Sequence, residues 1–239
     1  MKAKEMKVLR KKVEKADRVA NPLESLVDSE HCNYTLRAGA GQAGKYRLES
    51  SSLSPASGDQ NLVLRWCNSW RAIEPGHLFS DMMDLFEENM GELYKASSWG
   101  LDLEAKKEEF EHRKARFLIV TTSSAGASDT SEEKLVGFCH YRFNYDDDEY
   151  PSCVALYLYE IQVSSTFQSK SIGQFLMQVL NQIAQQASMS KVMLTVFKAN
   201  QRAMGFYTQK LQYKIDATSP SQTKHYADYE ILSKVLEPK

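Results

Sequence analysis

Residues 153–200 read, segment by segment, CVALYLYEIQV, SSTFQSKS, IGQFLMQVLNQIAQQA, SMS, KVMLTVF and KAN. The first and fifth segments are rich in β-branched and aromatic residues, and they predict strands over 153–163 and 191–197. Residues 172–187 carry apolar side chains at spacings that alternate between three and one, which predicts an amphipathic helix. A strand, a long helix and a second strand in this order indicate the α/β class.

The connection from the first strand to the helix has the composition of an anion site. It ends in Gln168-Ser-Lys-Ser-Ile-Gly173, so a polar loop opens the long helix. The first backbone N–H groups of a helix have no partner within it, and the helix dipole is positive there. Lys170 adds charge and Gly173 allows close approach of a ligand, as a pyrophosphate requires. Taken alone, the loop favours an ordinary strand-to-helix connection over an anion site.

The flanking sequence extends this pattern in both directions. Strands are predicted over 61–67, 116–122, 134–143, 213–216 and 226–232, and helices over 75–96, 103–113 and 200–211. The strands 116–122 and 134–143 are joined by a Ser-rich loop and form an antiparallel hairpin. The result is a mixed central sheet flanked by helices.

Two further segments precede this domain, which we assign to residues 61–239. Residues 1–30 form a helical extension and linker, with eight basic and three acidic residues between positions 2 and 18. This basic helix favours either nuclear targeting and contact with nucleic acid or the ribosome, or a solvated face that packs through Leu9, Val13 and Ala16. Residues 31–60 are interpreted as a flexible Gly/Ser-rich insertion, most clearly over 38–60.

Composition excludes several protein classes. The chain has 239 residues, 42% of them hydrophobic and 26% charged, and a net charge of −1, so any electrostatic recognition is local. The cysteines lie at 32, 67, 139 and 153 without a C-x-x-C pair, so no metal site is expected. No segment has the ~20 apolar residues of a membrane span, and the N-terminus lacks the apolar core of a signal peptide.

Two signatures resemble the GNAT superfamily of N-acetyltransferases. Gln168-x-x-x-x-Gly173 is similar to its acetyl-CoA loop, and Asn200-x-x-Ala203 followed by Phe206-Tyr207 is similar to its second motif. The resemblance covers roughly residues 61–232 and implies the GNAT fold with acetyl-CoA as co-substrate and no metal. Two positions depart from it, since Ser171 and Gln212 stand where the family usually has glycine.

Further motifs resemble the N-alpha-acetyltransferase D (NatD) family. They include Tyr157-x-Tyr-Glu-Ile-Gln-Val163, Tyr94-x-x-Ser-x-Trp-Gly100 and Ile215-Asp-x-x-Ser-Pro-Ser221. The resemblance implies acetylation of the N-terminal serine of core histones whose tails begin Ser-Gly-Arg-Gly. It also implies a nuclear and cytoplasmic protein, which we expect to be a monomer without membrane contact.

The resemblance assigns roles to individual residues. Glu160 is the expected general base, because a protein N-terminal amine with a pKa of ~8 must lose a proton before it attacks a thioester. Tyr207 is the expected acid for the departing thiolate. A strand carboxylate in a salt bridge and a core aromatic are the alternatives for these two residues. The expected cofactor contacts are Ile161, Gln162, Val163, Gln168, Ser169, Lys170, Ser171, Ile172, Gly173, Gln174 and Asn200.

The expected substrate contacts are mostly aromatic or acidic. They are Tyr94, Trp99, Asn144, Tyr145, Asp146, Tyr157, Tyr159, Thr195, Ser219 and Tyr229. Asp146, or the acids beside it at 147–149, is expected to pair with the arginine at position three of the tail. The alternatives left open are an acetyltransferase of the same fold acting on lysine or small amines, and a non-catalytic histone-tail or acyl-CoA-binding module.

Overall fold

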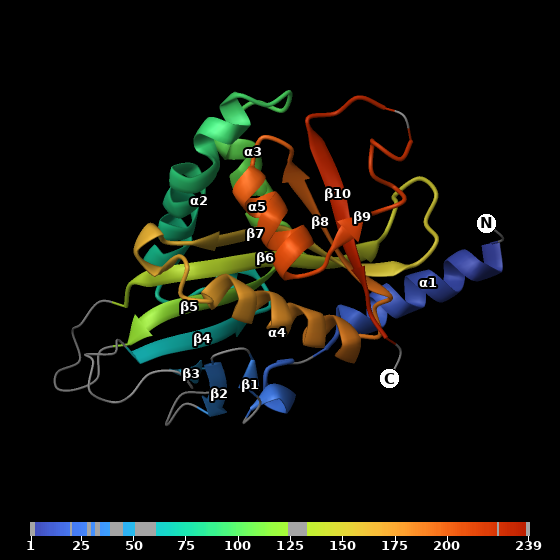
Figure 1. Ribbon diagram of the computed structural model, residues 1–239. Helices are drawn as coiled ribbons and strands as arrows, with labels where there is room; N and C mark the ends of the chain where they lie inside the picture. Colours follow the sequence, from blue (N-terminus) through green and yellow to red (C-terminus); the bar gives the residue numbers. More distant parts are fainter. Residues whose placement is uncertain are drawn as a thin grey trace.

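A ten-stranded sheet forms the centre of the molecule (Figure 1). The computed structural model describes residues 3–19, 21–27, 30–31, 34–38, 45–50, 61–123, 133–223 and 225–237. The strands lie in the order β1-β2-β3-β4-β5-β6-β7-β8-β10-β9, and only β7 and β8 are parallel. Their bounds are β1 Glu30–His31, β2 Tyr34–Ala38, β3 Lys45–Ser50, β4 Asn61–Cys67, β5 Arg116–Ser123, β6 Leu135–Tyr145, β7 Val154–Val163, β8 Lys191–Phe197, β9 Lys214–Ile215 and β10 Tyr229–Val235.

Helices cover both faces of the sheet. They are α1 Ala3–Ala16, α2 His77–Lys95, α3 Leu103–Glu111, α4 Ile172–Gln186 and α5 Gln201–Gly205, which continues into a π-helical turn over Phe206–Lys210. Three short 3-10 helices span Glu24–Leu26, Trp70–Ala72 and Ser165–Phe167. The predicted α/β architecture with a mixed sheet and an N-terminal helix is confirmed.

The sheet separates two hydrophobic cores, because successive side chains of a strand point to opposite faces. On β5, Leu118 and Val120 join the core that contains α1 and α4. Phe117 and Ile119 join the core that contains α2 and α3. The alternating spacing of apolar residues in α4 places eight of its residues in or against the first core.

The parallel pair of strands separates part-way along its length. Pairing between β7 and β8 runs from Ala155 to Leu158 and then stops. A bulge in β7 lies at the same point, because His140 pairs with Glu160 whereas Tyr141 pairs with Leu158, which leaves Tyr159 as the extra residue. The second half of β7 therefore has one free edge, and its backbone groups face an opening instead of a neighbouring strand.

The expectation of a flexible insertion over 38–60 is wrong in part. Residues Lys45–Ser50 form β3, which pairs with β2 and β4 in the sheet. The glycine- and serine-rich sequence on either side of this short strand led to the prediction of a loop, yet its Tyr46 is buried in the core. Tyr34–Ala38, within the wider insertion predicted over 31–60, form β2. Residues 32–33, 39–44 and 51–60, and residues 124–132 of the second Ser-rich loop, lie outside the described residues.

The basic N-terminal helix is confirmed as α1, which extends away from the sheet (Figure 1). Val13 and Ala16 are buried, as the docking interpretation expects. Its basic side chains at positions 4, 7, 10, 11, 12 and 15 are exposed. Nucleic-acid or ribosome contact through them stays a prediction, as do the monomeric state and the nuclear and cytoplasmic location. No helix within the described ranges is both long and apolar enough to cross a bilayer.

Candidate active site

Two cavities meet at the point where β7 and β8 separate. The larger, of about 710 Å³, lies between the free edge of β7, the start of α4 and α5. The smaller, of about 370 Å³, opens beside α3 and the end of β6. Both are lined by Tyr94, Trp99, Leu158, Tyr159 and Thr195. A ligand in one cavity can therefore meet a ligand in the other at these residues.

The loop that opens α4 is shaped to receive an anion. Ser169 and Ser171 both have positive φ, at 61° and 64°, and Ser171 is the N-cap residue of α4. Gln168 fixes the loop by donating to the Val163 carbonyl at 2.9 Å, and its own carbonyl accepts from Arg202 at 2.6 Å. The predicted departure at Ser171 thus keeps the backbone shape that glycine would give, at a conformational cost of about 1–2 kcal/mol.

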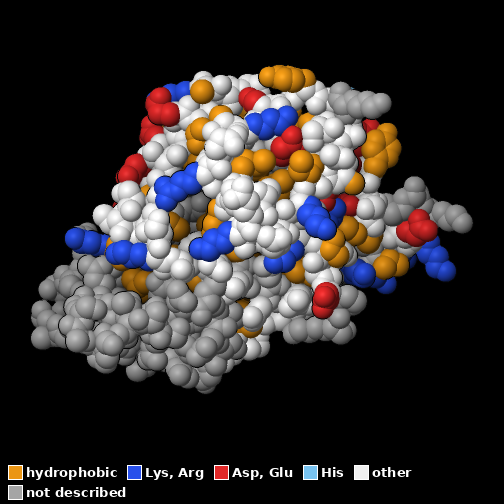
Figure 2. Space-filling model, in the orientation of Figure 1, with side chains coloured by type: hydrophobic (Ala, Val, Ile, Leu, Met, Phe, Trp, Pro, Cys, Tyr) orange, Lys and Arg blue, Asp and Glu red, His pale blue; other side chains and the backbone are white. Residues whose placement is uncertain are grey.

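Space at Gly173 fits a bound ligand. A Cβ built there would have only an ordinary contact, 3.5 Å from the Phe206 ring, so packing within the protein does not require the glycine. Figure 2 shows Lys and Arg side chains beside the hollow on this face, and Arg202 and Lys210 line the larger cavity. Helix N–H groups, cationic side chains and the free β7 edge together suit a long phosphorylated thioester.

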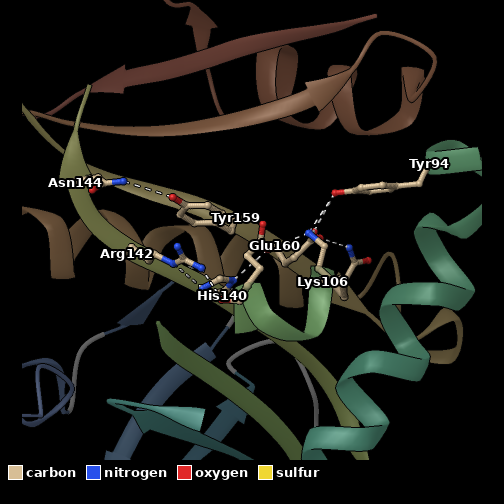
Figure 3. Close-up of polar contacts among 9 residues, drawn as sticks. Tyr94, Lys106, His140, Arg142, Asn144, Tyr159 and Glu160 are labelled. Carbon is tan, nitrogen blue, oxygen red and sulfur yellow. Dashed lines mark hydrogen bonds and ion pairs between the residues drawn. The ribbon is translucent and has the colours of Figure 1, made fainter. Parts of the chain in front are cut away.

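Glu160 lines the larger cavity and is only 5% exposed, and Figure 3 shows its polar contacts. Its Oε1 accepts from Lys106 Nζ at 2.8 Å and from the Tyr94 hydroxyl at 3.5 Å, and its Oε2 accepts from Gln162 at 2.8 Å. Gln162 is in turn fixed by Asn89, which donates to its carbonyl at 3.0 Å. Burial raises the pKa of Glu160, while Lys106 opposes the shift. The result is a fixed carboxylate suited to accepting a proton.

The buried Lys106 and His140 and the half-buried Glu109 form the rest of this cluster, and sequence analysis missed all three. Lys106 also donates to Glu109 at 2.9 Å, and His140 Nδ1 lies 3.7 Å from the same carboxylate. Burial lowers the pKa of His140 to about 4, so its ring is neutral at pH 7. One signal was available, because Leu103, Lys106 and Phe110 follow helical spacing and place the lysine on the inward face of α3.

Aromatic rings form one wall of the shared region. Trp99 packs against Tyr94, Phe197 and Tyr229, with ring centroids 5.1–6.0 Å apart. Its backbone is held by the neighbouring Ser98, whose N–H and hydroxyl donate to Asp228 at 2.6 and 3.2 Å. Trp99 itself remains 49% exposed. A rigid and partly exposed aromatic wall suits an extended peptide better than a small free amine.

Most of the predicted residues line the cavity that their expected role requires. In the larger cavity these are Glu160, Tyr207, Ile161, Gln162, Val163, Gln168, Ser169, Ser171, Ile172, Gly173, Gln174 and Asn200. In the smaller cavity they are Tyr94, Trp99, Asn144, Tyr145, Asp146, Tyr157, Tyr159 and Thr195. Lys170 lies outside both linings, over the Phe167 ring at 5.0 Å, and Tyr229 supports Trp99 from behind.

Two expected substrate contacts have structural roles instead. Ser219 is fully buried, donates to Glu230 at 2.6 Å and accepts from the Ile231 N–H, so it is not accessible to a peptide. Asp146 accepts from the N–H groups of Ser152 and Cys153 and pairs with Lys191 at 3.4 Å. Burial would raise its pKa, but these contacts outweigh burial and hold the pKa at about 2. Both of its oxygens are therefore already engaged within the protein, although Lys191 is shared with Asp216, which it contacts at 2.8 Å.

Tyr207 is buried at the inner end of the larger cavity. Only 7% of the residue is exposed, and burial raises the pKa of the phenol far above its ordinary value. The hydroxyl is therefore protonated throughout the neutral range and retains the proton that an acid would supply. This state agrees with the predicted acid role, which stays a prediction.

Comparison with known proteins agrees with this geometry. The family model described as the acetyltransferase (GNAT) family matches residues 79–213, more than half of the chain. A similar fold occurs in an acetyltransferase from Streptococcus agalactiae, at 14% identity and a TM-score of 0.51 over 72% of this chain and 98% of that one. A domain from Methanocaldococcus jannaschii has 12% identity and a TM-score of 0.50 over 74% and 100%. NAA60 from Arabidopsis thaliana, in complex with a bisubstrate analogue, has 12% identity and a TM-score of 0.49 over 74% and 99%.

Proposed function

Because the chain belongs to the acetyltransferase (GNAT) family, whose members use acetyl-CoA, we propose that it acetylates protein N-termini, specifically the serine amine of histone tails that begin Ser-Gly-Arg-Gly. The observation that carries this proposal is that two cavities share Tyr94, whose hydroxyl donates to the buried Glu160. One cavity has an anion-binding helix start, and the other has aromatic walls and acidic residues. Each thus suits one of the two substrates.

The buried carboxylate gives the reaction its base. When bound, acetyl-CoA supplies the acetyl thioester. Glu160 takes a proton from the substrate's ammonium group, either directly or through the Tyr94 hydroxyl 3.5 Å away. The freed amine nitrogen forms the new bond to the acetyl carbon, and the carbon–sulfur bond breaks. Tyr207 holds a proton at the same cavity and supplies it to the departing sulfur. The new amide nitrogen releases its second proton to water, and the phenol regains a proton from water.

Specificity follows from the shape and charge of the smaller cavity. Tyr157, Tyr159 and Trp99 line this cavity, and a glycine at position two of the peptide, which has no Cβ, fits beside such rings. Arginine at position three needs a carboxylate that the protein does not already use. Asp148 fits this requirement better than Asp146, since it lines the cavity, is exposed and lies close enough to raise the pKa of Tyr159.

A peptide panel tests this proposal. Initial rates with acetyl-CoA are measured on a Ser-Gly-Arg-Gly peptide, on the same peptide with alanine at position three, and on an unrelated N-terminus. The proposal expects a ~10- to 100-fold lower kcat/KM for the alanine peptide, from a charge-assisted contact of ~1.5–3 kcal/mol. Equal rates on all three peptides would reject the histone-tail specificity, and the absence of any acetylation would reject N-terminal acetyl transfer.

A further inference from the structure

Lys106 is a buried cation that joins two carboxylates. Its side chain is 8% exposed, and its Nζ lies 2.8 Å from Glu160 and 2.9 Å from Glu109. It also donates to the Tyr94 hydroxyl at 3.3 Å and lies over the Phe86 ring at 4.8 Å. A lysine is seldom buried unless it is paired, so its contacts account for its place in the core.

The two carboxylates face different cavities. Glu160 lines the larger cavity, whereas Glu109 lines the smaller one together with Lys106. Because both bind the same ammonium group, they are close enough to repel each other when that group is removed. Two neighbouring carboxylates without a cation cannot both stay ionised in a buried site.

We infer that Lys106 is a positioning residue that keeps Glu160 ionised beside Glu109. Glu160 can then accept the amine's proton, while Glu109 stays negatively charged at the cavity that receives the substrate. The inference rests on the proposed function, since it gives Glu160 the role of base. It concerns a residue that contacts neither reacting atom in the proposed reaction. Lys106 acts through the charge and the orientation of Glu160.

The charged and titratable groups around the cluster come from five elements. Besides Lys106 they are Tyr94 of α2, Glu109 of α3, His140 and Arg142 of β6, Glu160 of β7, and Tyr207 across the larger cavity. His140 is neutral, and Arg142 donates from Nε to its Nε2 at 3.3 Å. Lys106 is thus the charged group that contacts the base, and it lowers the pKa of Glu160. Glu109, which binds the same ammonium group, raises that pKa by charge repulsion.

Opposite shifts in the pH profile test the inference. The acid limb of kcat/KM reports the ionisation of the free enzyme's base. In Lys106→Met the two carboxylates lose their shared cation, so this limb should move to higher pH by about one unit or more. Lys106→Arg retains the charge and should restore most of the wild-type profile. Lys95→Met, which removes an exposed lysine at the end of α2, is the matched control and should leave the profile unchanged.

Glu109→Gln provides the second and independent arm. It removes the repelling charge and leaves Lys106 to Glu160 alone, so the acid limb should move to lower pH. All variants are measured on one peptide, so the titration of the substrate amine is common to them. An unchanged limb in Lys106→Met, or a shift in the same direction in both variants, would overturn the inference. The proposed function fails separately, if the wild-type enzyme acetylates no N-terminus.

Discussion

Replacing Glu160 with glutamine separates its chemistry from its structural role. The amide keeps the size of the side chain but cannot take up the amine's proton, so turnover should fall by ~10²-fold or more. Stability should fall as well. One of the two Glu160 oxygens, which accept from Lys106 and from Gln162, is replaced by an NH2 group that cannot accept. Losing one charge-assisted hydrogen bond corresponds to about 1.5–3 kcal/mol. Lys106 retains Glu109, which limits the loss.

Two assays distinguish these effects. Turnover is measured with saturating acetyl-CoA and peptide at neutral pH, and stability by urea unfolding monitored through tryptophan fluorescence. Val13→Ala removes buried methyl groups in α1, outside the linings of both cavities, and serves as a control with a stability loss of about 2 kcal/mol and normal turnover. Acetyl-CoA affinity should be nearly the same in both variants and in the wild type. If Glu160→Gln turns over within a factor of about two of wild type, Glu160 is not the base.

Three further substitutions test other parts of the site. Ser171→Gly removes a side chain at positive φ, so we expect about 1 kcal/mol of added stability. By calorimetry, the variant should bind acetyl-CoA at least as tightly as the wild type does. Weaker binding would indicate that the Ser171 hydroxyl contacts the ligand. His140 has an ordinary pKa of 6.5 that burial lowers to about 4, so the unfolded chain gains its proton first as the pH falls. The free energy of unfolding should drop by about 3 kcal/mol between pH 6.5 and 4, and His140→Phe should flatten that slope in urea titrations. Asp148→Asn should lower kcat/KM ~10-fold on the arginine peptide and little on the alanine peptide, whereas Asp146→Asn should instead lower stability; strictly additive losses would place the arginine elsewhere.

The helix α4, the strands beside it and the loop that opens it could be predicted from the sequence. Their signals are local, because helical spacing, β-branched runs and a polar loop are visible within about 20 residues. The departures at Ser171 and Gln212, where the family usually has glycine, are also visible in the local sequence. Both adopt the positive φ that those glycines favour, at 64° and 61°.

Long-range charge pairing could not be predicted in the same way. Lys106 belongs to a strongly charged helix, and nothing adjacent in the sequence indicates that Glu160, 54 residues later, neutralises it. The role of Asp146 was mispredicted for a similar reason. The sequence does not show that its carboxylate binds Ser152, Cys153 and the distant Lys191. Ser219 matches a motif, yet its burial depends on how β10 packs. Motifs identified most positions near the cavities, whereas the contacts of each side chain required the fold.

The position of the acetyl group on the product tests the central claim most directly. A peptide that begins Ser-Gly-Arg-Gly and carries a lysine further along is incubated with acetyl-CoA and the enzyme, and fragment masses from tandem mass spectrometry locate the modification. The proposed function predicts one acetyl group, on the N-terminal nitrogen, and no product from a peptide whose N-terminus is already blocked. Acetylation of the lysine side chain, or of the blocked peptide, would contradict it.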